Sequence, residues 1–196
     1  SRDILTIKGL IRRGEARTAS SYNNIPLDRV HFLDLPFYET GKIQKNPISE
    51  ADVEIVRNLL REVKPHQIFV AGDLADPHGT HRVCTDAVFA AVDLEKEEGA
   101  KWLKDCRIWM YRGAWAEWEI ENIEMAVPIS PEELRAKRNS ILKHQSQMES
   151  APFLGNDERL FWQRSEDRNR GTATLYDQLG LASYEAMEAF VEYIPL

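Results

Sequence analysis

The chain has 196 residues, of which 43% are hydrophobic and 29% are charged, and its 25 basic and 32 acidic side chains give a net charge of −7. This composition is typical of one soluble globular domain with a sizeable core. It argues against a general nucleic-acid binder, and no apolar run approaches the roughly 20 residues of a membrane span.

The two cysteines, Cys84 and Cys106, stand alone in apolar surroundings without CxxC spacing. We expect them to be buried thiols in a reducing compartment rather than a disulfide. Together with the composition, this predicts a soluble cytoplasmic protein that has neither nucleic acid nor a membrane as partner.

The first third of the chain alternates helical and strand-like patterns. Residues 1–24 open on helical periodicity, and residues 30–35, VHFLDL, predict a strand that Pro36 ends. Ser49 and Asp52 then resemble a capping box, which predicts the start of a helix that stops at Pro65.

The middle third predicts the centre of a sheet. The apolar run at 67–71, QIFVA, is typical of a parallel strand buried on both faces. A helical stripe over 82–94 and a second strand at 107–111 follow. This alternation predicts a three-layer, Rossmann-like α/β domain with a mostly parallel sheet.

The last third is less regular. Residues 122–129 predict an edge strand, and Ser130 followed by Pro131 predicts a capped helix start. We expect loops and short helices over 151–180, where no period dominates, and a closing helix over 183–191.

Possible chemistry concentrates just after the strand at 67–71. Asp73, Asp76, His78 and His81 fall within nine positions, where open α/β sheets bind ligands. Carboxylates and imidazoles at this spacing suit a divalent metal or a proton carrier. The alternatives are a polar loop that caps the next helix, or a histidine placed in the core.

Two further side chains are candidates for contact with a substrate. Tyr38 follows a predicted strand and is expected to overhang the same sheet edge. His144 shares the inward face of the late helix with Ile141 and Met148. The competing interpretations are a loop anchor for Tyr38 and a hydrogen-bonded core residue for His144.

The sequence at 76–82, DPHGTHR, resembles the second histidine box, His-x-Asp-His, of the PIG-L or LmbE-like zinc deacetylases, which act on N-acetylglucosamine-type substrates. Arg12-Arg13-Gly14-Glu15 is similar to that family's arginine-containing helix. Lys137-Arg138 and the later run at 144–147, HQSQ, are similar to its lysine and His-x-Ser-Gln.

A narrower resemblance joins FLDLPFYETG at 32–41 with GDLADPHGTHR at 72–82. Both look like the carboxyl-terminal half of long bacterial glucosamine-6-phosphate deaminase or isomerase proteins. The resemblance implies that residues 1–196 are one LmbE-like deacetylase domain, the carboxyl-terminal fragment of a longer protein. It also implies an upstream isomerase-like domain as partner and leaves room for a homo-oligomer.

The resemblance implies roles for single residues. His81 matches the metal ligand, His78 the histidine that steadies the oxyanion, and Arg12 the arginine that contacts substrate. Asp76 joins His78 as a catalytic candidate, and Tyr38 and His144 join Arg12 as substrate-binding candidates. The implied cofactor is zinc, and the implied reaction is hydrolysis of an amide bond.

Two departures from the family pattern affect this expectation. Thr80 replaces the usual aspartate of the box, and the family's first box, His-Pro-Asp-Asp, does not occur in the 196 residues. We expect the fold to lack its first strand and first metal box and the chain alone to be inactive. The alternative is a non-catalytic sugar-phosphate-sensing or assembly module attached to an isomerase-like half.

Overall fold

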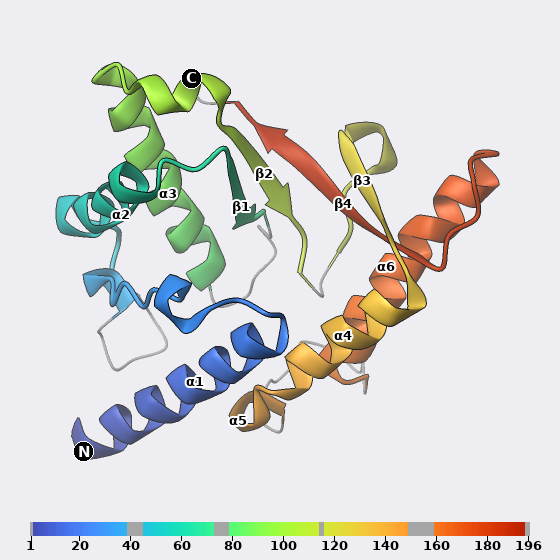
Figure 1. The fold of residues 1–196 in the computed structure, drawn as a ribbon, viewed down its shortest axis with the longest axis horizontal. Helices are drawn as coiled ribbons and strands as arrows, with labels where there is room; N and C mark the ends of the chain where they lie inside the picture. Colours follow the sequence, from blue (N-terminus) through green and yellow to red (C-terminus); the bar gives the residue numbers. More distant parts are fainter. Residues whose placement is uncertain (1, 39–44, 73–78, 114–115, 149–158, 195–196) are drawn as a thin grey trace. The chain divides into compact units, whose positions relative to one another are not determined.

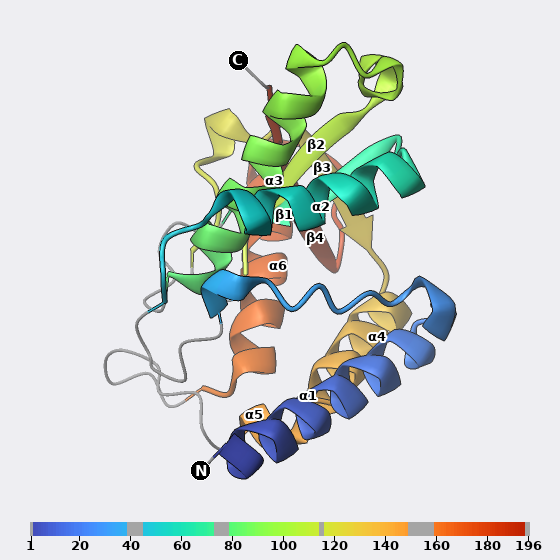
Figure 2. The same cartoon turned by 90° about the vertical axis from the view of Figure 1, so that its left-hand side faces the viewer.

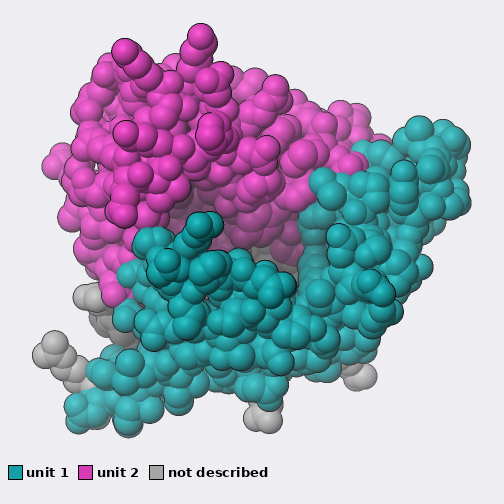
Figure 3. Space-filling view, viewed as in Figure 1, with its two compact units in different colours: residues 1–32, 127–188 teal, residues 33–126, 189–196 magenta. Residues whose placement is uncertain are grey.

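The computed structural model describes residues 2–38, 45–72, 79–113, 116–148 and 159–194. Helices and a four-stranded sheet make up these ranges, which confirms the α/β, Rossmann-like class (Figure 1). The chain divides into two compact units, coloured separately in Figure 3. Unit 1 comprises Ser1–Phe32 and Val127–Glu188, and unit 2 comprises Leu33–Ala126 and Ala189–Leu196.

Unit 2 contains the predicted βαβ element. Strand β1 (Gln67–Ala71) leads to helix α3 (Thr80–Glu97), which returns the chain to strand β2 (Arg107–Tyr111). The two strands pair in parallel, from Gln67 opposite Arg107 to Ala71 opposite Tyr111. Their carboxyl ends therefore lie together, as the sequence predicted.

The sheet has the strand order β1-β2-β4-β3. Strand β3 (Met125–Ile129) confirms the predicted edge strand, whereas β4 (Ala186–Tyr193) contradicts the closing helix expected over 183–191. Strand β4 pairs antiparallel with β2, so the sheet is mixed. Its Ala, Met and Glu residues favour helix, but cross-strand pairing overrides this local preference.

The prediction that β1 is buried on both faces was wrong. Among the described strands β1 lies at one end of the sheet order, and Phe69 is 48% exposed. Helices α2 (Glu50–Val63) and α3 pack side by side against one face of β1 and β2 (Figures 1 and 2). The core between these layers consists of apolar side chains from all four elements: Val53, Val56, Leu60, Val70, Ala87, Ala91, Val92 and Ile108.

Helix α2 begins at the predicted capping box. The Ser49 amide donates to Asp52 Oδ2 over 2.8 Å, and the Asp52 amide donates to Ser49 Oγ. The strand predicted at 30–35 does not form, because Asp34 takes a left-handed φ of 50° that interrupts extended backbone. A 3-10 helix, η2 (Pro36–Tyr38), follows and buries Phe37.

Unit 1 is mainly helical. The predicted first helix is α1 (Arg2–Tyr22), and the predicted capping box at Ser130 starts α4 (Pro131–Leu142). The sequence predicted one late helix, but the structure has two, because the chain breaks between α4 and the short helix α5 (Gln145–Met148). The remaining short elements are 3-10 helices: η1 (Leu27–Arg29) in unit 1, and η3 (Lys101–Asp105) and η4 (Ile120–Asn122) in unit 2.

Helix α6 (Phe161–Gln178) corrects the expectation of loops and short helices over 151–180, as far as that range is described. Its buried face is largely polar, so the sequence shows no helical repeat of apolar residues from which the helix could be predicted. Arg164, Ser165, Glu166, Asn169 and Thr172 are all buried on this helix. Glu166 receives two hydrogen bonds from the guanidinium of Arg138 on α4, at 2.5 and 2.6 Å.

Two smaller expectations were tested as well. Cys84 is exposed and Cys106 is partly buried, so only Cys106 approaches the expected buried thiol, and burial raises its pKa. Within the ranges that the structure describes, no helix combines the length and the apolar character needed to cross a bilayer.

Candidate functional site

The carboxyl end of β1 is the place where the predicted site loop begins. Gly72 follows the strand, and its amide donates to the Tyr111 carbonyl at 2.8 Å, which extends the pairing with β2. Asp73, Asp76 and His78 fall on residues 73–78, which lie outside the described part of the chain. Their predicted roles therefore stay predictions.

His81 is the second residue of α3 and is exposed. Thr85, one turn later on the same helix face, donates its hydroxyl to the Ala71 carbonyl at 2.7 Å. This bond fixes the first turns of α3 against the end of β1. His81 lies in the first turn of α3, one turn before Thr85, and its predicted role as a metal ligand stays a prediction.

The described residues do not by themselves complete a metal site. Among them, no group of three or more His, Cys, Asp or Glu side chains is placed to hold an ion. A zinc site commonly needs three protein ligands. His81 could supply one, and the others would have to come from residues outside the described ranges.

Tyr38 lies in η2, next to the amino end of α2. The amide of its neighbour, Phe37, donates to Asp52 Oδ1 at 2.9 Å. The Tyr38 ring is 44% exposed and carries the Lys45 ammonium 3.8 Å from its centroid. The side chain is available to a ligand, and its cation contact explains its orientation without one.

Unit 1 brings together two of the motifs behind the family resemblance. Glu15 on α1 accepts hydrogen bonds from the Ser146 amide at 2.6 Å and the Ser146 hydroxyl at 2.7 Å. These hydrogen bonds, with the nearby charges of His144 and Arg12, lower the pKa of Glu15. The predicted substrate-binding residues Arg12 and His144 are thus both within electrostatic range of one carboxylate.

Glu15 was not among the predicted site residues. Its signal in the sequence is its position in the run Arg12-Arg13-Gly14-Glu15, together with Ser146 in the HQSQ run. Because 131 positions separate the two partners, no local pattern connects them. We infer that Glu15 holds the amino end of α5 to α1.

This contact gives a first testable prediction. Replacing Glu15 with Ala should speed hydrogen exchange of the Ser146 amide several-fold, since the amide loses its acceptor. Because the pKa of Glu15 is lowered in the folded state, the contact should hold at neutral pH and weaken as pH falls through that pKa.

Amide exchange followed by NMR checks this result, with Glu132→Gln as the control on α4. Glu132 pairs with Arg135 at 3.9 Å on the exposed side of that helix. Equal exchange rates at Ser146 in the two variants would contradict the assignment.

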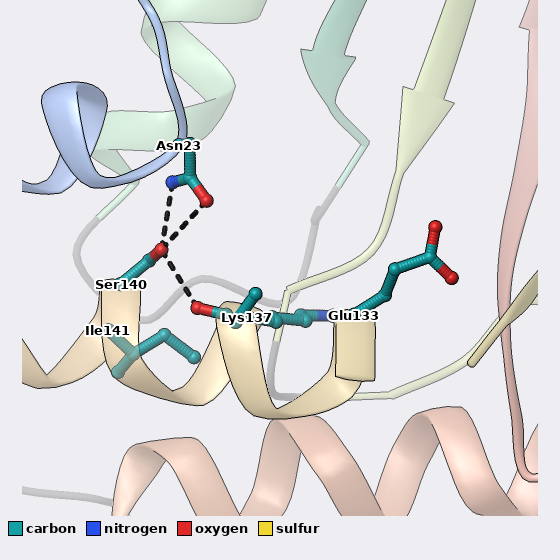
Figure 4. Close-up of a pocket in the computed structure, with 6 residues that line it drawn as sticks. Asn23, Glu133, Lys137, Ser140 and Ile141 are labelled. Carbon is teal, nitrogen blue, oxygen red and sulfur yellow. Dashed lines mark hydrogen bonds between the residues drawn. The ribbon is translucent and has the colours of Figure 1, made fainter. Parts of the chain in front are cut away.

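A shallow cavity of about 390 Å³ lies in unit 1, between the end of α1 and α4 (Figure 4). The Asn23 amide donates to Ser140 Oγ at 2.8 Å in its wall. Glu133 is engaged in the capping box of α4, and the Lys137 ammonium bonds Asn169 and Glu188 at 2.6 and 2.7 Å. None of the predicted site residues lines this cavity.

Comparison with known proteins places the fold. No family model matches the chain. A conserved protein from Thermus thermophilus, TT1542, is similar in structure, with a TM-score of 0.57 and 19% identity over 95% of this chain and 74% of that one. A deacetylase of the teicoplanin biosynthesis pathway, solved as a deacetylase-bog complex, matches with a TM-score of 0.55 and 17% identity over 94% of this chain and 73% of that one. At these identities the likeness establishes the fold alone.

Proposed function

We propose that this chain is part of a cytoplasmic, zinc-dependent deacetylase that hydrolyses the amide bond of N-acetylglucosamine-type substrates. The observation that carries the proposal is that His81 lies in the first turn of α3, a helix that the Thr85 hydroxyl ties to the Ala71 carbonyl at the end of β1. Asp76 and His78 precede His81 by no more than five positions. The likeness of the fold to a solved deacetylase supports the same chemistry.

The proposed roles follow from the types of side chain. His81 would be a metal ligand, and a bound zinc would supply a water whose pKa is lowered to roughly 7. His78 would stabilise charge on the amide oxygen, and Asp76 would take part in proton transfer. Arg12, Tyr38 and His144 would contact the substrate.

His81 alone cannot form a zinc site, because such a site commonly needs three protein ligands. We propose that the two missing ligands come from a His-Pro-Asp-Asp-type box outside these 196 residues. Such a box belongs to the narrower proposal of a longer protein related to glucosamine-6-phosphate deaminases or isomerases. The 196 residues alone should then bind zinc weakly and release no acetate.

The test is metal analysis and acetate release in the full-length protein. We expect about one zinc per chain, and at least a tenfold loss of zinc affinity in His81→Ala. His66→Ala is the matched control, because His66 immediately precedes β1 at the opposite end of the same strand and is exposed. Its zinc content and rate of acetate release should equal those of the wild type.

Two outcomes would overturn parts of the proposal. Acetate release by the 196-residue chain alone would overturn the need for ligands from outside these residues. A full-length protein without zinc would favour the sugar-phosphate-sensing or assembly module, for which the replacement of the box aspartate by Thr80 is the sequence argument.

A further inference from the structure

Strand β1 has a neighbouring strand on one side only, among the strands that the structure describes (Figure 1). In its pairing with β2, the His66 carbonyl accepts from the Arg107 amide at 2.9 Å, and the Gly72 amide donates to the Tyr111 carbonyl at 2.8 Å. Backbone groups alternate in direction along a strand, so the amide and carbonyl of Phe69 point away from β2. We call this side the free edge of β1.

The composition of β1 is that of an interior strand. After Gln67 its residues are all apolar, and it contains neither a charged residue nor a proline. Such runs are typical of parallel strands with neighbours on both sides, whereas proteins protect an open edge with charged residues or proline. Strand β3, at the other end of the strand order, does contain a proline, Pro128. Of the two end strands, β3 is therefore suited to an open edge and β1 is not.

The two faces of β1 differ in the same sense. Val70 is 8% exposed and belongs to the core under α2 and α3. Successive side chains point to opposite faces of a strand, so Phe69 lies on the other face. Its ring contacts Phe190 edge to face, with the centroids 5.4 Å apart, and remains 48% exposed. A strand paired along the free edge would cover part of this ring through cross-strand contacts.

We propose that a further strand of the same protein, from outside residues 1–196, pairs with the free edge of β1 and makes β1 an interior strand. The size of the similar structures supports this occupant. The two matches cover 74% and 73% of the solved chains, so about a quarter of each of those chains lies outside the matched part. The inference shares with the proposed function the existence of a longer protein, but it involves neither zinc nor acetate release.

The test is hydrogen exchange of single amides in the full-length protein, followed by NMR. The Phe69 amide should exchange on the order of 100-fold more slowly than an open amide, because a hydrogen-bonded strand must open before it exchanges. The Val70 amide, which faces β2, is the internal control and should show similar protection. Nuclear Overhauser contacts from the Phe69 amide should lead to a residue outside 1–196, and the protection should persist when the protein is diluted.

Two variants of the full-length protein isolate the contribution of this amide. Phe69→Ala removes the ring, and Phe69→Pro removes both the ring and the amide hydrogen. A proline is tolerated at an open strand edge but not where its position must donate to a neighbouring strand. Phe69→Pro should therefore unfold at a clearly lower urea concentration than Phe69→Ala. If Phe69→Pro does not fold at all, amide exchange in the wild type decides.

The results that would overturn the inference are specific. Rapid exchange at Phe69, with equal urea midpoints for the two variants, means that the edge is open in the full-length protein. Protection that disappears on dilution assigns the edge to a second copy, and contacts that lead only to residues within 1–196 assign it to this chain. A full-length protein that protects Phe69 but binds no zinc defeats the proposed function and leaves this inference standing.

Discussion

Replacing Glu188 with Ala is expected to destabilise the chain by about 3–5 kcal/mol, the cost typical of breaking a buried ion pair from one side. Glu188 lies on β4 and is 16% exposed. It accepts hydrogen bonds from Lys137 Nζ at 2.7 Å and Asn169 Nδ2 at 3.0 Å, and it pairs with the guanidinium of Arg168. The Arg168 side chain is only 6% exposed. Water can therefore hardly replace the carboxylate as the partner of its guanidinium.

Urea unfolding measures the effect, and Glu185 provides the control. Glu185 pairs with Arg170 in the same unit, but the two side chains are 40% and 45% exposed. An exposed pair contributes about 0–1 kcal/mol, so Glu185→Ala should leave the unfolding midpoint nearly unchanged. Similar losses of unfolding free energy in Glu185→Ala and Glu188→Ala would show that burial of the Glu188 ion pair does not add to its contribution to stability.

The contribution of Glu188 to stability depends on pH with a definite sign. Burial opposes ionisation of Glu188, but the charges of Arg168 and Lys137 and their hydrogen bonds outweigh it and lower the pKa. A carboxyl with a lowered folded-state pKa stabilises the fold above its unfolded pKa, which is about 4.3. This stability is lost as pH falls through the folded-state pKa. The difference in unfolding free energy between the wild type and Glu188→Gln should therefore be largest near neutral pH and shrink below about pH 4.

The same network explains which elements could be predicted from the sequence. Helices α2 and α4 were predicted because Ser49 and Ser130 act on backbone only three residues away. Helix α6 and strand β4 were not predicted, because they are held together by hydrogen bonds between polar groups that are not neighbours in the sequence. The Asn169 amide, for instance, reaches the Met187 carbonyl at 2.7 Å. Periodicity in hydrophobic residues cannot reveal a buried face that is made of polar ones.

In the candidate site, too, features set by neighbouring residues could be predicted, and features set by distant residues could not. The helix expected after the strand at 67–71 could be predicted because its apolar stripe is a local property, and it is present as α3. The metal-ligand role of His81 stays a prediction. The role of Glu15 depends on Ser146, which is distant in sequence. A sequence shows which side chains could carry chemistry, whereas the residues that hold them in place become visible only with the fold.

A second large effect is expected for Asp52, which is fully buried. Its Oδ2 accepts from the Ser49 amide and hydroxyl at 2.8 and 2.6 Å, and its Oδ1 accepts from the Phe37 amide at 2.9 Å. Asp52→Ala removes half of a capping box and also leaves a buried backbone amide without its acceptor. These two losses each cost about 1–2 kcal/mol, which gives an expected destabilisation of about 2–4 kcal/mol.

Glu133 is the control that separates these two losses, because it completes the same kind of capping box at Ser130 without a further buried amide. Glu133→Ala should therefore cost clearly less than Asp52→Ala in urea unfolding. Asp52→Asn, which keeps one acceptor oxygen, should fall between the wild type and Asp52→Ala. Equal losses for Asp52→Ala and Glu133→Ala would mean that the Phe37 amide finds another acceptor, and that the bond joining η2 to α2 does not hold Tyr38 in place.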